Sequence, residues 1–563
     1  MTMAEPGVNP KILVNVVGCG CFPVLPGSYA SELVDNILSK TDLINGEAKV
    51  VAIIVDNTLR DLYYRFYKNC SISLVSLSSE MGIRIYRRSA AFLLIKACKD
   101  MYPDRNLIIR HSLSNGLYCE FPNQGITASE VSAVERRMRE LVKNNLPIEK
   151  ISLDKSAAQE IFFKQGQEEK SKLLELSSPG RVELYKLEDY YGYFYGYVVP
   201  KTGMVDKFRI LHYEPGIILQ TPEPSTPNTI QPYKEQKKLA SVFNEAKEWA
   251  GMLATPHVAA LNEKIEAGAI DDIIRVNEAL HEKKIALIAD QICNNRDIRL
   301  VLISGPSSSG KTTFAQRLLI QLRVNGRRPV AVSLDNYFVD RELTPRDENG
   351  DYDFESLDAL QLDLFNDHLA RLIKGEEVFT PVFDFKTGTS ISGQNPIKVP
   401  KGELIIVEGI HGLNDRLTWI IPKKMKFKVY ISALTQLNLD YTNRIPTTDS
   451  RLIRRIVRDQ RTRGYSAAET IRRWPSVRKG EERYIFPFQE DADVMFNSSL
   501  VYELSVLKNH VEPLLRQIGP HDPEFIESNR ILRFLSYFKP VSQESIPPNS
   551  IIREFIGGSW FRD

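Results

Sequence analysis

The stretch that decides the fold is RLVLISGPSSSGKTT, at residues 299–313. Residues 299–304 contain a run of four apolar residues, which predicts a buried strand, and a helical pattern continues from Lys311 to about Leu322. The segment between them fits G-x-x-x-x-G-K-[ST] in the strand–loop–helix context that a phosphate-binding loop requires. We therefore predict an α/β domain in which a parallel, doubly wound sheet carries a nucleotide-binding loop. A chance match is the alternative, and the flanking strand and helix disfavour it.

The residues of this loop suit the parts of a bound nucleotide. A glycine near each end lets the backbone turn, so that its N–H groups converge on phosphate oxygens at the positive end of the following helix. Lys311 can reach the β- and γ-phosphates, and the hydroxyl of Thr312 can bind Mg²⁺. The residues predicted to bind ATP are Gly305, Pro306, Ser307, Ser308, Ser309, Gly310, Lys311, Thr312 and Thr313.

Two acidic residues follow further apolar strand candidates. Residues 329–334 lead to Asp335, and residues 404–407 lead to Glu408. In doubly wound sheets, functional groups collect just beyond the carboxyl ends of the strands. We predict that Asp335 accepts the proton of an attacking hydroxyl and that Glu408 lies on the metal side of the site. The alternatives are a turn cap at Asp335 and a helix cap at Glu408.

An arginine-rich stretch runs from Arg444 to Arg483, with eleven arginines against five acids. Four of them recur at i, i+3, i+4 and i+7 and therefore share one helical face: Arg451, Arg454, Arg455 and Arg458. We predict a lid whose arginines close over phosphates and stabilise the transferring group. The alternatives are a solvated surface or a patch that binds RNA.

The composition is that of a globular protein with several domains. The chain has 563 residues, of which 43% are apolar, and its net charge is +2. A chain that mainly coats nucleic acid would have a larger basic excess. No apolar run approaches the roughly 18 residues that span a bilayer, and the first residues lack a signal-peptide pattern. The six cysteines are scattered, so we expect reduced thiols, a cytoplasmic protein and no membrane partner.

A proline-rich stretch separates the two halves of the chain. Residues 214–233 hold five prolines and few charges, which predicts an extended connector. In the N-terminal half we predict a helix at 89–100 and another that opens with a capping box at Thr127–Glu130. The helix after the connector is predicted to pack between the halves through Leu239, Val242, Phe243, Ala246, Trp249, Ala250 and Leu253.

From about residue 299 to 515 the chain resembles the phosphoribulokinase/uridine kinase family. The shared motifs are the loop with its serine triplet, SLDNY at 333–337, YDFESLDAL at 352–360, PVFDF at 381–385, VEGI at 407–410, RLIRRIVRD at 451–459 and ADV at 492–494. The resemblance implies a kinase that uses ATP and Mg²⁺. It also implies that Asp335 is the catalytic base, that Asp353 holds the ribose and that Thr312 and Glu408 serve the magnesium ion. Lys311 and the lid arginines Arg455, Arg458 and Arg463 complete the implied catalytic set.

The chain departs from uridine kinases where they read the base. A tyrosine and a histidine of that family correspond here to Phe383 and Gly388, so no imidazole can bind the edge of a pyrimidine. The lid has Gly464-Tyr465 in place of Gly-Arg, and a glutamine position corresponds to Arg473. The substrate-binding candidates are Asp353, Phe383, Tyr337 and Arg473.

The N-terminal half resembles two other modules. Residues 11–66 are similar to a TGS domain, a small β-grasp module, and residues 80–213 are similar to the second domain of threonyl-tRNA synthetase. In the synthetases that domain has two histidines, a cysteine and a further histidine at an editing site. The corresponding residues here are Arg88, Phe92, Phe194 and Val198, none of which can bind a metal ion. We therefore expect no zinc there and a role as scaffold, oligomerisation surface or sensor.

Together these features predict a multidomain α/β and α+β protein that transfers the γ-phosphoryl group of ATP to a hydroxyl of a nucleoside-like molecule. The alternatives are a kinase for a non-nucleoside sugar or sugar phosphate, which Arg473 favours, and a nucleotide-dependent RNA-binding or regulatory protein. We expect a homo-oligomer. The predicted units are a TGS-like domain at 1–68, a synthetase-like domain at 69–222, a helical connector at 223–295, the kinase-like domain at 296–519 and a tail at 520–563 that packs on the body.

Overall fold

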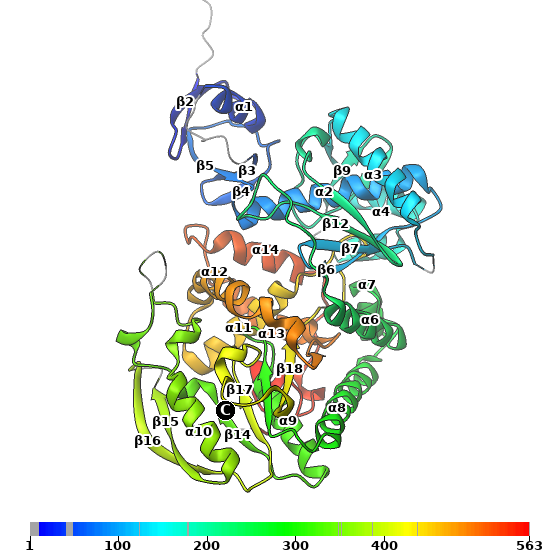
Figure 1. Ribbon diagram of the computed structural model, residues 1–563. Coiled ribbons are helices and arrows are strands. Elements are labelled where there is room, and N and C mark those ends of the chain that lie inside the picture. The colour runs from blue at the N-terminus through cyan, green and yellow to red at the C-terminus, as the bar shows by residue number, and fades with distance from the viewer. Residues whose placement is uncertain are drawn as a thin grey trace, which may run out of the picture.

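The structure is a computed structural model that describes residues 11–40, 49–122, 124–176, 180–346, 348, 350, 352–384, 387–435 and 437–561. Figure 1 shows a small N-terminal sheet domain, an α+β domain beside it and a larger α/β domain that contains the arginine-rich helices. The predicted multidomain α/β and α+β class is therefore confirmed. Among the residues described, no helix is long and apolar enough to cross a membrane.

The N-terminal domain is a five-stranded mixed sheet with one helix. The strands lie in the order β2-β1-β5-β3-β4, with β1 paired in parallel to β5. Apolar residues alternate along β1 and point into a core that the sheet shares with the helix. This core includes Val14, Val16, Leu33 and Phe66. The elements are β1 Ile12–Val16, β2 Gly20–Val24, α1 Ala30–Lys40, β3 Val50–Val55, β4 Thr58–Arg60 and β5 Cys70–Ser76.

The second domain begins with the long helix α2 (Glu80–Met101). The helix starts nine residues before the predicted one, because the hydroxyl of Ser79 accepts the N–H of Gly82 and caps it. The predicted capping box at Thr127 and Glu130 is confirmed at the start of α3 (Ala128–Lys143). The other elements are β6 Ile108–Leu113, β7 Gly116–Glu120, β8 Glu149–Asp154, α4 Lys155–Lys164, α5 Glu168–Glu175, β9 Arg181–Leu187, β10 Tyr190–Gly192, β11 Arg209–Tyr213 and β12 Gly216–Gln220.

The predicted connector at 214–233 is wrong in its first part. Residues 216–220 form the fully buried strand β12, which lies inside the sheet β11-β12-β7-β6. Three helices follow, α6 (Lys237–Met252), α7 (Val258–Glu266) and α8 (Ile270–Asn294). The apolar face of α6 packs between the halves as predicted. It joins Ile218 of the second domain and Tyr430 of the C-terminal domain in one apolar cluster.

The C-terminal domain is built on a parallel sheet of order β14-β17-β13-β18-β19. The central strand β13 is buried along its whole length, as its apolar sequence predicts for a strand covered on both faces. The elements of the C-terminal domain up to α13 are β13 Leu300–Ser304, α9 Lys311–Val324, β14 Val330–Ser333, α10 Leu362–Lys374, β15 Glu377–Asp384, β16 Thr389–Lys398, β17 Ile405–Glu408, β18 Lys426–Ser432, α11 Thr447–Arg463, α12 Ala467–Tyr484, β19 Val494–Asn497 and α13 Glu503–Leu515.

The last residues of the chain are part of the same core. Helix α14 (Phe525–Leu535) and the short α15 (Arg553–Ile556) pack on the helices of the sheet, and Ile551, Ile552 and Phe555 are fully buried in the largest apolar cluster of the molecule. The tail therefore completes the C-terminal domain, and it brings side chains from the end of the chain to the phosphate-binding loop.

Candidate active site

The phosphate-binding loop has the backbone geometry that its motif requires. Gly310 directly precedes α9 and has a φ of +84°, which only glycine adopts without strain. A Cβ atom on Gly305 would lie 2.0 Å from the carbonyl oxygen of Ile431 in β18. The two glycines are therefore needed for different reasons, one for a backbone conformation and the other for a close approach between neighbouring strands.

The predicted metal ligands lie side by side next to this loop. The hydroxyl of Thr312 donates to Oε1 of Glu408 at 2.9 Å. Glu408 ends β17, which pairs in parallel with β13, so the carboxyl ends of both strands meet at the loop. Lys311 Nζ donates to the carbonyl oxygens of Gly305 and Pro306 at 3.0 and 3.2 Å. A neighbouring hydroxyl and carboxylate fit Mg²⁺, which prefers oxygen ligands beside a phosphate.

Two further hydroxyls in the loop support the same interpretation. The Oγ atoms of Ser308 and Ser309 are buried, and neither has a hydrogen-bond partner among the described residues. A buried hydroxyl without a partner is costly, and an anion bound in the loop would supply the missing acceptor. The loop therefore suits a phosphate chain.

Asp335, Glu408 and Lys311, which lie near the carboxyl ends of the strands, influence each other's pKa values. Burial raises the pKa of Glu408 to about 7, while Lys311 opposes the rise and Glu554 adds to it. Desolvation by the neighbouring protein also raises the pKa of Asp335, against the pull of Lys311, although the residue keeps an exposed surface. Burial lowers the pKa of Lys311, and the three nearby carboxylates oppose that change. Asp335 is surrounded by charged groups but its side chain is exposed to solvent, so a substrate hydroxyl can reach it.

Two of the four arginines on one face of α11 do not form a lid, and this part of the prediction is wrong. Arg451 and Arg454 are 1% and 0% exposed. Arg451 donates to the carbonyl oxygen of Ser307 at 3.1 Å and forms an ion pair with Glu481 of α12. Glu481 also accepts the N–H of Ser307 at 3.0 Å. This pair fixes the backbone of the phosphate-binding loop and cannot swing over a ligand.

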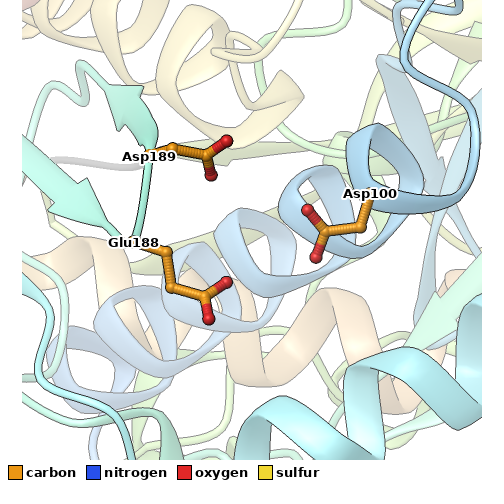
Figure 2. Close-up of side chains that lie close together, drawn as sticks. All are labelled: Asp100, Glu188 and Asp189. Carbon is orange, nitrogen blue, oxygen red and sulfur yellow. The ribbon is translucent and has the colours of Figure 1, made fainter.

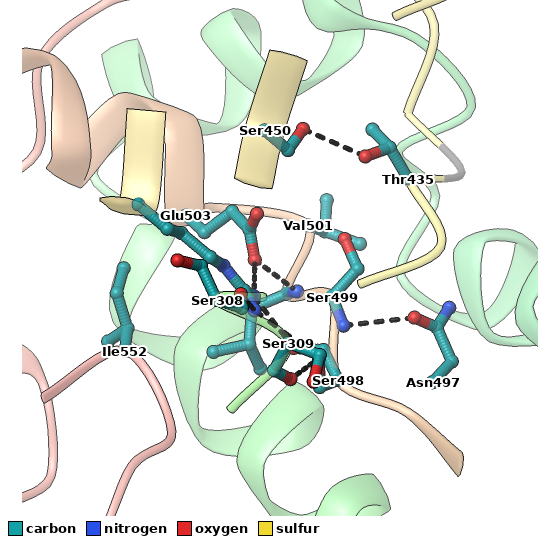
Figure 3. Close-up of polar contacts among 12 residues, drawn as sticks. Ser308, Ser309, Thr435, Ser450, Asn497, Ser498, Ser499, Val501, Glu503 and Ile552 are labelled. Atoms are coloured by element: carbon teal, nitrogen blue, oxygen red, sulfur yellow. Dashed lines mark hydrogen bonds and ion pairs between the residues drawn. The ribbon is translucent and has the colours of Figure 1, made fainter. Parts of the chain in front are cut away.

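Figure 3 shows Glu503, Ser498 and Ser309, through which the next part of the loop is fixed in the same way by Arg454. Its guanidinium forms an ion pair with Glu503 at 2.5 Å and donates to the carbonyl oxygen of Ser498 at 2.8 Å. The hydroxyl of Ser498 in turn donates to the carbonyl oxygen of Ser309 at 2.5 Å. The start of α13 is thereby tied to the loop. A preorganised loop is what electrostatic stabilisation of a phosphoryl group requires.

The other predicted lid arginines converge on one buried carboxylate. Arg455, Arg458 and Arg463 lie 3.2, 2.7 and 3.7 Å from Asp459, which is 1% exposed. Arg455 also donates to the hydroxyl of Ser307 at 2.8 Å. Asp459 therefore gathers three guanidinium groups beside the loop. Their combined charge exceeds that of Asp459, which suits the binding of further negative charge.

The predicted substrate residues have different surroundings. Asp353 accepts the hydroxyl of Tyr484 at 2.7 Å, and Phe383 in β15 lies against the ring of Phe338, with 5.5 Å between ring centres. Arg473 is exposed on α12, and its guanidinium stacks on the ring of Tyr465 at 4.2 Å. Arg473 is therefore a stacking partner of Tyr465, the tyrosine that stands where the family has a lid arginine.

The prediction that Tyr337 binds the substrate is wrong. Its side chain is fully buried, and its hydroxyl bonds to Nδ1 of His368 at 3.0 Å. The ring packs edge-on against Phe365 of α10. A side chain closed off from solvent in this way has a structural role. The sequence motif could not show this, because it gives the position of the tyrosine after Asp335 and not the direction of its side chain.

Gly388, which the resemblance to uridine kinases aligns with a base-reading histidine, has a backbone conformation that favours glycine. Its φ is +77°, and a Cβ atom there would lie 2.6 Å from the guanidinium of Arg341. The backbone N–H of Arg341 donates to the carbonyl oxygen of Gly388 at 2.8 Å. A cationic side chain therefore packs on this glycine.

Sequence reasoning missed several glutamates of the site. Glu481 and Glu503 hold the buried arginines, and Glu554 from the tail accepts both the N–H and the hydroxyl of Thr313, at 3.1 and 3.0 Å. Burial raises the pKa of Glu355 to about 7, with Arg455 opposing that rise. A usable signal existed only for Glu355, which stands inside the shared motif at 352–360. The others follow from packing between distant segments.

The position of the synthetase editing site is filled by packed side chains. Phe92 and Phe194 meet edge to face, with 5.1 Å between ring centres, and Val198 is fully buried. Arg88 donates to the carbonyl oxygen of Tyr197 at 2.8 Å. Burial lowers the pKa of Arg88 to about 10, which still leaves a cation at neutral pH. Aromatic rings and a guanidinium thus stand where a metal ion would need donors.

Another group of acids lies at the far end of α2 (Figure 2). Asp100, Glu188 and Asp189 point toward one another at a spacing that would suit a cation. Lys96 already forms ion pairs with all three, at 2.5 to 3.1 Å. Arg137 pairs with Asp100 at 2.8 Å as well. These two basic side chains offset most of the negative charge of the three carboxylates, so the group is an ion-pair network.

Comparison with known proteins identifies the C-terminal domain. Residues 300–505 match the phosphoribulokinase / uridine kinase family. This domain is a kinase-family domain. The match begins at β13, includes the loop, Asp335 and Glu408, and ends within α13. The resemblance noted in the sequence is thereby confirmed for this part of the chain.

The N-terminal half matches threonine–tRNA ligases. The ligase of Acidithiobacillus ferrooxidans is 32% identical over 162 residues, which are 28% of this chain and 25% of the ligase. The ligase of Syntrophotalea carbinolica is 30% identical over 165 residues, 29% of this chain and 26% of the ligase. The chain thus spans about a quarter of the length of these relatives.

Two solved structures are similar to parts of this chain. One, assigned to a fructose transport system kinase of Silicibacter sp. TM1040, is 19% identical and covers 38% of this chain and 98% of its own, with a TM-score of 0.27. The other, assigned as a uridine kinase of Bacillus stearothermophilus, is 18% identical and covers 36% of this chain and 89% of its own, with a TM-score of 0.22.

Proposed function

We propose that this protein transfers the γ-phosphoryl group of ATP to a hydroxyl group of a nucleoside-like small molecule. The observation that carries the proposal is the group formed by Lys311, Thr312, Glu408 and Asp335 at the carboxyl edge of the parallel sheet, next to a loop that buried arginines hold rigid. Functional groups of doubly wound α/β proteins collect at this edge. The match to a kinase family supports the same reaction class.

In this mechanism the residues of the chain bind charge and move one proton. The loop N–H groups and Lys311 hold the phosphates, and Arg455, Arg458 and Arg463 neutralise negative charge on the transferring group. Thr312 and Glu408 would hold Mg²⁺, which shields the phosphate charge. Asp335 accepts the proton of the substrate hydroxyl as that oxygen attacks. Asp353 binds a neighbouring part of the substrate.

A sugar phosphate is the second candidate for the acceptor. The favouring observation is the contact between Arg341 and Gly388, at the position where uridine kinases read the base. A guanidinium there suits a carboxylate or phosphate better than a pyrimidine edge. Because the guanidinium of Arg473 stacks on Tyr465, Arg341 is the arginine that would bring positive charge to an anionic acceptor.

An ADP-release screen over nucleosides, sugars and sugar phosphates tests the proposal. Asp335→Asn keeps the shape of the side chain but removes its basicity. Since a positioned general base contributes about 10²–10⁴-fold, kcat should fall by that factor while ATP affinity stays nearly unchanged. A turn cap predicts near-normal kcat, because asparagine caps about as well as aspartate. Near-normal kcat in the variant, or turnover unchanged in Lys311→Ala, would contradict the assignment.

A further inference from the structure

The C-terminal segment 550–557 lies directly against the start of α9. The carboxylate of Glu554 accepts the N–H of Thr313 at 3.1 Å and its hydroxyl at 3.0 Å. Thr313 belongs to the first turn of α9 and is 2% exposed. In an α-helix the N–H groups of the first turn have no partner inside the helix, and they attract anions. Glu554 therefore satisfies a donor that a phosphate could otherwise use.

The segment is held in this place by contacts on both sides. Ser550 donates to the buried Glu278, and the side chain of Ile551 would lie 2.5 Å from a Cβ atom on Gly310. Arg461, near the end of α11, donates to the backbone carbonyl oxygens of Glu554 and Phe555 at 2.8 and 3.2 Å. The arginine-rich helix and the tail are thus connected through Arg461.

The charged groups around Glu554 are those that a bound phosphate would also meet. Glu554 interacts electrostatically with both Lys311 and Glu408. It is attracted by the lysine that a phosphate chain would use, and it adds negative charge next to the predicted metal ligand. A nucleotide phosphate that approaches Thr313 therefore meets a like charge on the same donor.

We propose that Glu554 is an internal competitor for the nucleotide: its carboxylate occupies the anion-binding position at Thr313, and a nucleotide phosphate must displace it. The C-terminal segment then sets the nucleotide affinity, and the release of Glu554 accompanies nucleotide binding. This inference rests on the proposed binding of ATP at the loop. The competing explanation is that Glu554 only caps α9, whose N-cap residue Gly310 has no side chain to do so.

The charge-removing variant Glu554→Gln distinguishes these explanations. Glutamine keeps the length of the side chain and one acceptor oxygen, so a capping role is largely preserved. ATP and ADP affinities, measured by calorimetry, should increase about 2- to 30-fold, the range that corresponds to an anion at a helix N-terminus. Adenosine, which has no phosphate, should show no gain. Glu544→Gln is the matched control, because Glu544 is an exposed glutamate of the same tail.

A second variant acts on the same contact from α11. Arg461→Gln removes two bonds to the backbone of the tail, and it should increase ATP affinity in the same direction even if Glu554→Gln does not fold. Unchanged affinity in both folded variants, with wild-type binding still lost in Lys311→Ala, would overturn this inference and leave the proposed function standing. If neither the wild type nor the variants bind ATP through Lys311, the proposed function fails and this inference fails with it.

Discussion

Replacing Glu481 tests whether the buried ion pair really holds the phosphate-binding loop. Glu481 is 1% exposed and pairs with Arg451, which is equally buried. It also accepts Arg478 Nη1 at 2.8 Å and the N–H of Ser307 at 3.0 Å. In Glu481→Gln the guanidinium of Arg451 stays buried without a counter-charge. Removing one partner of a buried pair costs about 3–5 kcal/mol.

The expected loss is large enough for thermal unfolding to resolve. For a domain of this size, 1 kcal/mol corresponds to about 2–4 °C, so the melting temperature of the kinase-family domain should fall by about 6–20 °C. The neighbouring variant Glu482→Gln removes an exposed carboxylate that pairs with Arg478 at 2.9 Å. Exposed pairs contribute about 0–1 kcal/mol, so this control should change little.

The pH dependence gives the same prediction an independent check. Burial works against the charged form of Glu481, but Arg451 and Arg478 outweigh it and lower the pKa of the carboxyl. A depressed pKa in the folded state stabilises the protein above the unfolded-state pKa, near the ordinary glutamate pKa of 4.5. That stability is lost as the pH falls through the lower, folded pKa. The difference between wild type and Glu481→Gln should therefore shrink under acidic conditions. A loss as small as that of Glu482→Gln at neutral pH would refute the reasoning.

Two further predictions concern parts that the proposed chemistry does not use. Elemental analysis of the purified protein should find no stoichiometric zinc in the synthetase-like domain, because Arg88 and Phe92 offer no ligand atom to a cation; one tightly bound zinc per chain, lost on deletion of residues 1–222, would contradict this. Tyr337→Phe should lower stability by about 0.5–1.5 kcal/mol through the lost bond to His368. Its KM for the acceptor should not change, and a raised KM would return Tyr337 to the substrate site.

The phosphate-binding loop could be predicted from the sequence because its chemistry is local. A short apolar strand, two glycines at fixed spacing and a lysine followed by threonine leave few other structures for that stretch. The same holds for the capping box at Thr127, whose two hydrogen bonds span only three residues. The order of strands, helices and acids along the chain also placed Asp335 and Glu408 at the end of their strands, where the structure has them.

The tertiary structure decided what covers each face and which distant residues meet. Helical spacing placed Arg451, Arg454, Arg455 and Arg458 on one face, but two of them are buried against the loop. Their partners lie 30 and 49 residues away, and Glu554 meets Thr313 across 241 residues. Periodicity describes a helix surface and carries no information about what packs on it. Contacts of this kind form only when distant segments pack together. A charged group that is buried loses its hydration, and it is stable there only when it is paired.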